Sequence, residues 1–219
     1  GIVLVSGSGP SNNVQYTTPT ILGTTITLAS APDVGSTDTA DKGSSGVEGA
    51  KGRGYDATIN INPSLGTEIL SGLNIYAGAA EVEQYQKGSA AEHNQYDAVA
   101  GITFDLGPVA IGAMGSGHYT GEDSAATYNG YKSTAFGIAF NINDSLSVSY
   151  GGWDQRKASY NDEHAQGGPA DRNTKVRSFQ VAATMGGASV RVADIKTENR
   201  MYTAGADDHA TVISLGLAF

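Results

Sequence analysis

The last stretch of the chain, residues 209–219, alternates between large apolar and small side chains. In an extended strand, successive side chains point to opposite faces. One face of this strand therefore carries an apolar row that ends on an aromatic ring, and the other face is small and nearly featureless. The apolar row is Thr211, Ile213, Leu215, Leu217 and Phe219. A fold for this chain has to give these two faces different surroundings.

The same two-residue period recurs along the chain, and a helical period of 3.6 residues is absent throughout. Each alternating segment is bounded by turn residues or by a polar, Gly- and Ser-rich segment. The sequence therefore predicts an all-β protein with eleven strands. They are expected near residues 13–17, 24–31, 55–62, 73–80, 96–106, 109–118, 134–142, 146–150, 178–185, 189–193 and 209–219.

The connections between these segments alternate between short turns and long polar loops. The short ones are expected at 20–23, 63–72, 107–108, 143–145 and 186–187. The long ones are expected at 32–54, 83–94, 119–130, 155–175 and 197–208. Short turns at one end and long loops at the other are typical of outer-membrane barrels. We therefore expect residues 1–219 to form a single domain, an antiparallel transmembrane β-barrel in the outer membrane of a Gram-negative bacterium.

The composition is compatible with a barrel, in which only every second strand residue faces lipid. Hydrophobic residues make up 39% of the 219 residues, and no run approaches the roughly 20 apolar residues of a membrane-spanning helix. The formal net charge of −9 argues against nucleic acid as a partner, because phosphate neutralisation needs a basic surface. The absence of cysteine excludes a disulfide framework and a thiolate metal site.

Several weak motifs in order resemble the general porins of Gram-negative proteobacteria. They are the segment Asn-Val-Gln-Tyr-Thr-Thr-Pro at 13–19, the segment at 23–30, the rhythm of turns and loops, and the terminal Phe219. The resemblance implies a sixteen-stranded barrel that assembles as a homotrimer and has a loop folded into its lumen. Counting back from Phe219, the eleven segments would be the sixth to the sixteenth strands, and residues 1–11 the end of the constriction loop.

An odd number of strands is itself informative, because single-chain bacterial barrels have even numbers and open edges are excluded from hydrocarbon. Further strands are therefore expected to complete the barrel, and the sixteen strands that the resemblance implies would place about five of them before this sequence. The alternative is a twelve-stranded barrel in which residues 1–7 form an extra strand. The apolar run from Ile2 to Val5 does not alternate, which counts against this alternative.

A porin needs a wet lumen, a narrow place and a charge pattern there, and no catalytic group. We therefore expect passive diffusion of small hydrophilic solutes and ions, and no enzymatic activity. One alternative is a structural or adhesive barrel that displays loops or anchors surface components. A soluble β-sandwich is the alternative without a membrane.

The side chains predicted to face the lumen are small and polar, where a packed core would carry Leu, Ile and Val. The candidate pore-lining residues are Asp56, Asn60, Asp97, Gln180 and Arg191. Arg191 would face acidic groups across the channel, although pairing with a carboxylate on the wall or a one-residue shift in register would remove that role. Asp56 and Asp97, at the loop ends of their strands, would attract cations or serve as solvated rim carboxylates.

Aromatic residues at the strand ends predict girdles at the two membrane interfaces. The candidates are Tyr16, Phe104, Phe140, Tyr150 and Phe219. Trp153 would also fit a girdle, although strict alternation points it inward; a bulge there would reconcile the two.

No cofactor or metal site is expected. The four histidines, His93, His118, His164 and His209, fall in or beside predicted loops, without the spacing of a metal site. The acidic loops offer the oxygen ligands that Ca²⁺ takes, but none has the spacing of an EF-hand. Calcium in these loops is left as an open alternative.

Overall fold

A single antiparallel sheet forms the fold in the computed structural model. The structure describes residues 11–34, 51–63, 70–84, 93–121, 130–158 and 172–217. Each strand pairs with the next one along the chain, so the order in the sheet is the order in the sequence. The strands are β1 (Val14–Thr17), β2 (Thr24–Ala31), β3 (Lys51–Ile61), β4 (Leu73–Gln84), β5 (Gln95–Leu106), β6 (Val109–Tyr119), β7 (Gly130–Asn143), β8 (Leu146–Ala158), β9 (Arg172–Met185), β10 (Ala188–Glu198) and β11 (Asp208–Leu217).

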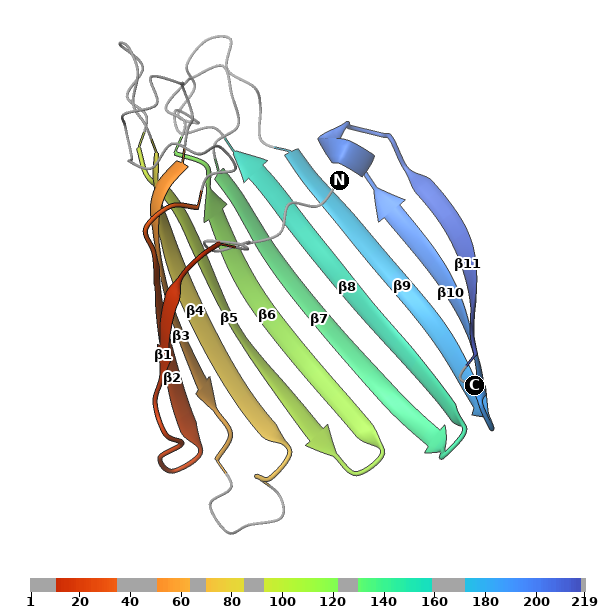
Figure 1. Ribbon diagram of the computed structural model, residues 1–219. Helices are drawn as coiled ribbons and strands as arrows, with labels where there is room; N and C mark the ends of the chain where they lie inside the picture. The colour runs from red at the N-terminus through yellow and green to blue at the C-terminus, as the bar shows by residue number, and fades with distance from the viewer. Residues whose placement is uncertain are drawn as a thin grey trace.

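The sheet is tilted and curved, and it is open between β1 and β11 (Figure 1). The predictions of an all-β fold with eleven antiparallel strands are confirmed, but the described strands do not close into a barrel. The described ranges contain no α-helix, only a short 3-10 helix, η1 (Arg200–Tyr202), between β10 and β11. No helix in these ranges is long and apolar enough to cross a membrane.

Cross-strand pairing sorts the side chains into two faces that run across the whole sheet. Directly opposed residues of neighbouring strands lie on the same face. One such row joins Phe104, Ile111, Ile138, Tyr150 and Phe179 on consecutive strands. The face that includes this row is called the apolar face here. The opposite face, on which Thr27, Thr58 and Gly78 are successive neighbours, is called the polar face.

The two faces differ in how much solvent they meet. On the apolar face large side chains stay exposed, as at Ile138, which is 48% exposed. On the polar face several polar side chains are buried, among them Asp97, Ser133 and Gln155. Side chains on the concave side of a curved sheet crowd together, and those on the convex side spread apart. The polar face is therefore the concave, inner side of the sheet, and the apolar face is the outer side.

The strands are longer than the sequence predicts at the end of the sheet where the long loops emerge, called the loop end here. β3 begins at Lys51, β8 continues to Ala158 and β9 begins at Arg172, all inside segments predicted as loops. The predictions at these strand ends were wrong for a physical reason. Polar residues occupy both faces there, so the alternation that marks a strand in the sequence disappears while the backbone pairing continues.

The connections follow the predicted asymmetry with one exception. At the turn end, opposite the loop end, β5–β6, β7–β8 and β9–β10 are joined through residues 107–108, 144–145 and 186–187. Gly107 and Gly186 take up positive φ values of 56° and 57° there, which a residue without a Cβ adopts readily. The β3–β4 connection, residues 62–72, is also at the turn end but is as long as some connections at the loop end.

Trp153 lies on the inner face, and no bulge interrupts the strand beside it. It is opposite Ala135 on β7 and Val176 on β9 in an uninterrupted register. The register of β7 and β8 shifts only between Asn141 and Asn143, at the turn end. Trp153 therefore takes the inward position that strict alternation gives it, and no bulge turns it towards a girdle. The inner face accepts a large aromatic side chain at this height because the same row contains the small Ala135.

Candidate functional site

The five residues predicted to line a channel all lie on the polar inner face. Asp56 and Asp97 are both opposite Ala80, on the two sides of β4. Gln180 is opposite Ser149, and Arg191 is opposite Ala182. Continuous pairing from β3 to β10 carries one face through all of these positions. The predicted register is therefore confirmed, whereas their role in a channel stays a prediction.

These residues line a wall and do not gather into a cluster. Asp56 and Asn60 are on β3 and Asp97 is on β5, whereas Gln180 and Arg191 are on β9 and β10. The carboxylates and the guanidinium group are thus separated by several strands of the curved sheet. Such a distribution gives a wall with charge of opposite sign on its two sides.

Asp97 is held in a side-chain pair and is not a solvated rim carboxylate. Its side chain is only 4% exposed, and its Oδ1 lies 2.5 Å from Nδ1 of His118 on the neighbouring strand. Gln95 donates a second hydrogen bond, from Nε2 to Oδ2, over 3.1 Å. Because a buried carboxylate needs such partners, Asp97 is part of the packed inner wall.

Sequence reasoning missed a buried polar group at the loop end of β7, β8 and β9. Gln155 donates from Nε2 to Oγ of Ser133 over 2.6 Å, and its Oε1 accepts a hydrogen bond from the hydroxyl of Tyr202. All three residues, with Thr174, are buried. Gln155 and Thr174 fall in the segment predicted as a loop, and Tyr202 is far along the chain. The sequence could have predicted this group only if the alternation of each strand had been continued past its last apolar residue.

The predicted girdle residues lie on the apolar face as far as the structure describes them. Tyr16, Phe140 and Tyr150 are exposed there, and Phe104 shares a pairing row with Tyr150. Phe219 lies outside the described residues. The aromatic rings also contact one another on this face: the centroids of Phe136 and Tyr150 are 6.0 Å apart. Assignment to a membrane interface stays a prediction.

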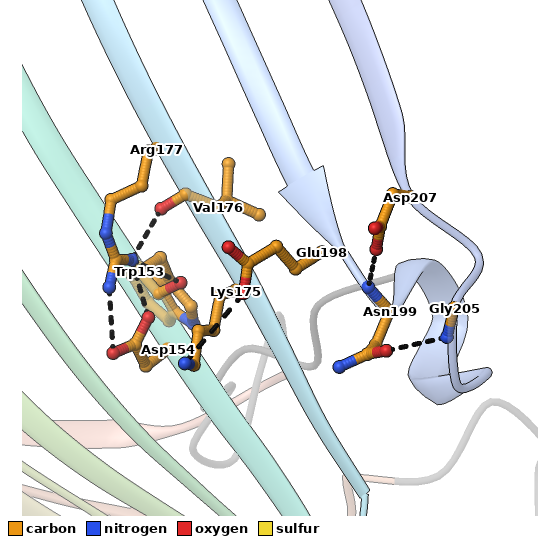
Figure 2. Close-up of polar contacts among 9 residues, drawn as sticks. All are labelled: Trp153, Asp154, Lys175, Val176, Arg177, Glu198, Asn199, Gly205 and Asp207. Atoms are coloured by element: carbon orange, nitrogen blue, oxygen red, sulfur yellow. Dashed lines mark hydrogen bonds and ion pairs between the residues drawn. The ribbon is translucent and has the colours of Figure 1, made fainter.

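A charged group interrupts the apolar face near the loop end of β8 and β9, as Figure 2 shows. Arg177 forms two hydrogen bonds to the carboxylate of Asp154, over 2.5 and 3.1 Å. The guanidinium group also lies 5.6 Å from the centroid of the Phe136 ring. It fits there because Gly152 has no side chain: a Cβ at Gly152 would come within 2.9 Å of Nη1 of Arg177 and 2.6 Å of the Phe136 ring.

Two further ion pairs lie on the apolar face beside this group. Nζ of Lys175 is 3.8 Å from Oε2 of Glu198, and Nε2 of His209 is 2.6 Å from Oδ2 of Asp194. Both pairs are exposed, so each contributes little to stability in water. The apolar rows of β9, β10 and β11 therefore end in charged side chains, whereas that of β6 runs from Val109 to Tyr119 without a charge.

Two of the histidines lie on strands, close to the strand ends that adjoin loops. His118 is on β6 and His209 is on β11, and each pairs with an aspartate. His93 is in the connection before β5, and His164 lies outside the described residues. In the described ranges no three His, Asp or Glu side chains come close enough to hold a metal ion.

No protein family model matches the chain, and no curated protein matches it. The argument for function therefore depends on the two faces of the sheet.

Proposed function

We propose that this chain forms the wall of an outer-membrane diffusion channel, a porin through which small hydrophilic solutes and ions pass. One observation carries the proposal: the same eleven-stranded sheet exposes large apolar side chains on its outer face and small polar ones on its inner face. In water, so large an exposed apolar surface would favour aggregation. In a bilayer it would be the surface that lipid covers.

The outer face supports lipid contact over most of the sheet. From β5 to β7 the three rows nearest the turn end consist of Ile, Leu, Val, Phe and Ala, as in the row of Phe104, Ile111 and Ile138. The rows nearer the loop end also contain Gly, Thr and Tyr, and Lys132 lies on this face there. The main contacts of each of these strands are with its neighbours in the sheet. A barrel strand of about 9–11 residues is long enough to cross the hydrocarbon region, and most of the described strands reach this length.

The inner face supports a water-filled interior. Many of its positions are Thr, Ser, Asn, Gly or Ala, as at Thr103, Gly112 and Gly137, although one row towards the loop end also contains Met114 and Trp153. Such side chains do not fill space as the Leu, Ile and Val of a packed core do. Polar hydroxyl and amide groups on a channel wall remain hydrogen-bonded to water, so solutes that carry their own hydration shell can pass.

The proposal requires partners for both open edges of the sheet. The outer backbone groups of β1 and β11 have no strand beside them in the described sheet, and unsatisfied backbone groups are excluded from hydrocarbon. We propose that further strands close the sheet into a barrel and that three copies assemble, in the outer membrane of a Gram-negative bacterium. Extraction tests the membrane assignment: release by salt or carbonate without detergent would contradict it.

Single-channel recording tests the function. The intact native protein, purified in detergent, is added to a planar lipid bilayer under an applied voltage. Discrete, long-lived conductance steps are expected, because a wet lumen conducts ions as soon as the barrel inserts. Protein that inserts but gives no steps would contradict a channel and favour a plugged barrel that anchors or displays surface components.

A further inference from the structure

The connection between β10 and β11, residues 199–207, folds over the inner face of the sheet. It joins two neighbouring strands, so a short turn would suffice. Instead it contains η1, which packs on β9, and Figure 1 shows η1 beside the loop ends of β9 and β10. Tyr202 reaches further, to the inner face of β8 and β7. This connection is called the inner-wall loop here.

Tyr202 is the residue that fastens the inner-wall loop to the sheet. Its backbone N–H donates to Oγ1 of Thr174 on β9 over 3.1 Å. The same hydroxyl of Thr174 donates to the carbonyl of Asn199 over 2.8 Å. The phenol hydroxyl of Tyr202 donates to Oε1 of Gln155 on β8. Each end of this tyrosine is therefore tied to a different strand.

The aromatic ring of Tyr202 also contacts side chains of the inner face. The ring of Tyr131, on β7, lies 6.2 Å away between centroids. The ammonium nitrogen of Lys157 lies over the Tyr202 ring, 4.6 Å from its centroid. Tyr202 is only 8% exposed, whereas its neighbour Met201 is 62% exposed. The loop thus buries the side chain of Tyr202 against the inner face and leaves the side chain of Met201, the preceding residue, in solvent.

The inner-wall loop is also closed on itself. The backbone N–H of Asn199 donates to the carboxylate of Asp207 over 3.0 Å, and the carboxamide oxygen of Asn199 accepts from the N–H of Gly205 over 2.9 Å (Figure 2). The N–H of Arg200 donates to the carbonyl of Ala206 over 2.7 Å. Asn199, Met201 and Tyr202 have φ values of 51°, 54° and 60°, in the left-handed region that residues other than glycine seldom occupy. Three residues keep this strained backbone conformation only where the surrounding contacts hold the loop in place.

We propose that the inner-wall loop narrows the channel at its loop end, and that Tyr202 is the positioning residue that holds it there. This inference rests on the proposed channel function, because a segment on the concave face occupies lumen only if the sheet encloses one. By placing the Lys157 ammonium against its ring, Tyr202 also keeps a cation close to the wall. The loop therefore limits the size of hydrophilic solutes and reduces the positive charge that an entering ion meets.

Single-channel recordings on three proteins test this inference. The first is the wild type, the second has residues 200–206 replaced by two glycines, and the third is Tyr202→Ala. The shortened loop is expected to raise single-channel conductance beyond the spread among wild-type channels, because it removes material from the lumen. Tyr202→Ala is expected to increase open-state current noise and to shift the reversal potential in a salt gradient towards anion preference, because it releases the loop and the Lys157 ammonium.

The control is Tyr55→Ala, which removes the same side chain from the outer face, where Tyr55 is opposite Glu81 and Ser30. It is expected to leave conductance and reversal potential unchanged. Wild-type conductance and selectivity in both loop variants would overturn the inference while leaving the channel function intact. Absence of steps from the wild-type protein would instead overturn the channel function.

Cysteine labelling keeps the inference testable if the loop variants fail to assemble. The chain has no cysteine, so Met201→Cys introduces a single thiol on the exposed side of the loop. Modification by a bulky anionic thiol reagent is expected to reduce the current through open channels. An unchanged current after complete labelling would overturn the proposed position of the loop in the lumen.

Discussion

Two neighbouring residues of β8, Asp154 and Gln155, show how differently the two faces of this sheet satisfy polar groups. Asp154 points outward and pairs with Arg177, with side chains that remain 42% and 32% exposed. Gln155 points inward, is 1% exposed, and bonds to Ser133 and Tyr202. The outer face keeps charge where surrounding polar medium can solvate it. At this site the inner face buries a neutral amide under a folded loop.

The difference follows from what covers each face. A neutral amide with hydrogen-bond partners on both sides can be buried at little cost, whereas a buried charge needs compensation from every direction. The inner-wall loop supplies the cover over Gln155. On the outer face the sheet itself supplies the Phe136 ring, the space above Gly152 and the backbone carbonyls of Val176 and Trp153, to which Arg177 donates. Four substitutions would break or sharpen this contrast, and they follow in order of expected effect.

The largest effect is expected from a charge in the middle of the apolar face. Ile138→Arg is expected to destabilise the membrane-inserted protein by about 2–4 kcal/mol, the cost of an arginine at the midplane of a barrel. Its neighbour Ala139 lies on the inner face, so Ala139→Arg is the matched control and is expected to insert normally. Denaturant unfolding in lipid vesicles measures both. Equal destabilisation by the two variants would contradict the assignment of the faces.

The second effect concerns the buried amide. Gln155→Ala removes the hydrogen bonds to Ser133 and Tyr202 from a buried site and is expected to cost about 1–3 kcal/mol. Asp154→Ala removes an exposed ion pair, for which about 0–1 kcal/mol is expected. The urea midpoint of the detergent-solubilised protein compares the two. A larger loss for Asp154→Ala would show that the outer ion pair, and not the inner group, carries stability.

The third effect tests the space beneath Arg177. In Gly152→Ala the new methyl group would lie 2.6 Å from the Phe136 ring, so the ring and Arg177 must move, at a cost of about 1–3 kcal/mol. Gly137→Ala is the control, since a Cβ there meets only a carbonyl oxygen at 4.0 Å. Thermal unfolding in detergent should lower the midpoint for Gly152→Ala alone.

The smallest effect is expected at the exposed pair of His209 and Asp194. His209→Ala removes a contact that is open to solvent, so a change within about 0.5 kcal/mol is expected. The same thermal measurement serves here. A loss comparable to that of Gln155→Ala would indicate that this part of the outer face is covered by something that the eleven strands do not include.

The two-residue period predicted the strands well wherever one face was apolar. The predicted bounds of one strand, 24–31, agree with β2, and the central parts of β5 and β6 were predicted because Ile102, Phe104 and Ile111 mark one face there. The period did not predict the strand ends next to the loops, because both faces carry polar residues there, such as Asp154 on the outer face and Gln155 on the inner face. Backbone pairing continues there regardless of side-chain character, and no local pattern in the sequence records it.

The sequence by itself determined which residues share a face, because alternation along a strand is a local property of the backbone. The period alone places one set of residues on the same side of the sheet: Asp56, Asn60, Asp97, Gln180 and Arg191. Only the tertiary structure decided that Asp97 is buried against His118 and that Tyr202 closes over Gln155. Those contacts join residues far apart in the chain, and they depend on the curvature of the sheet and the path of one loop across it. Neither of these is encoded in the period of a single strand.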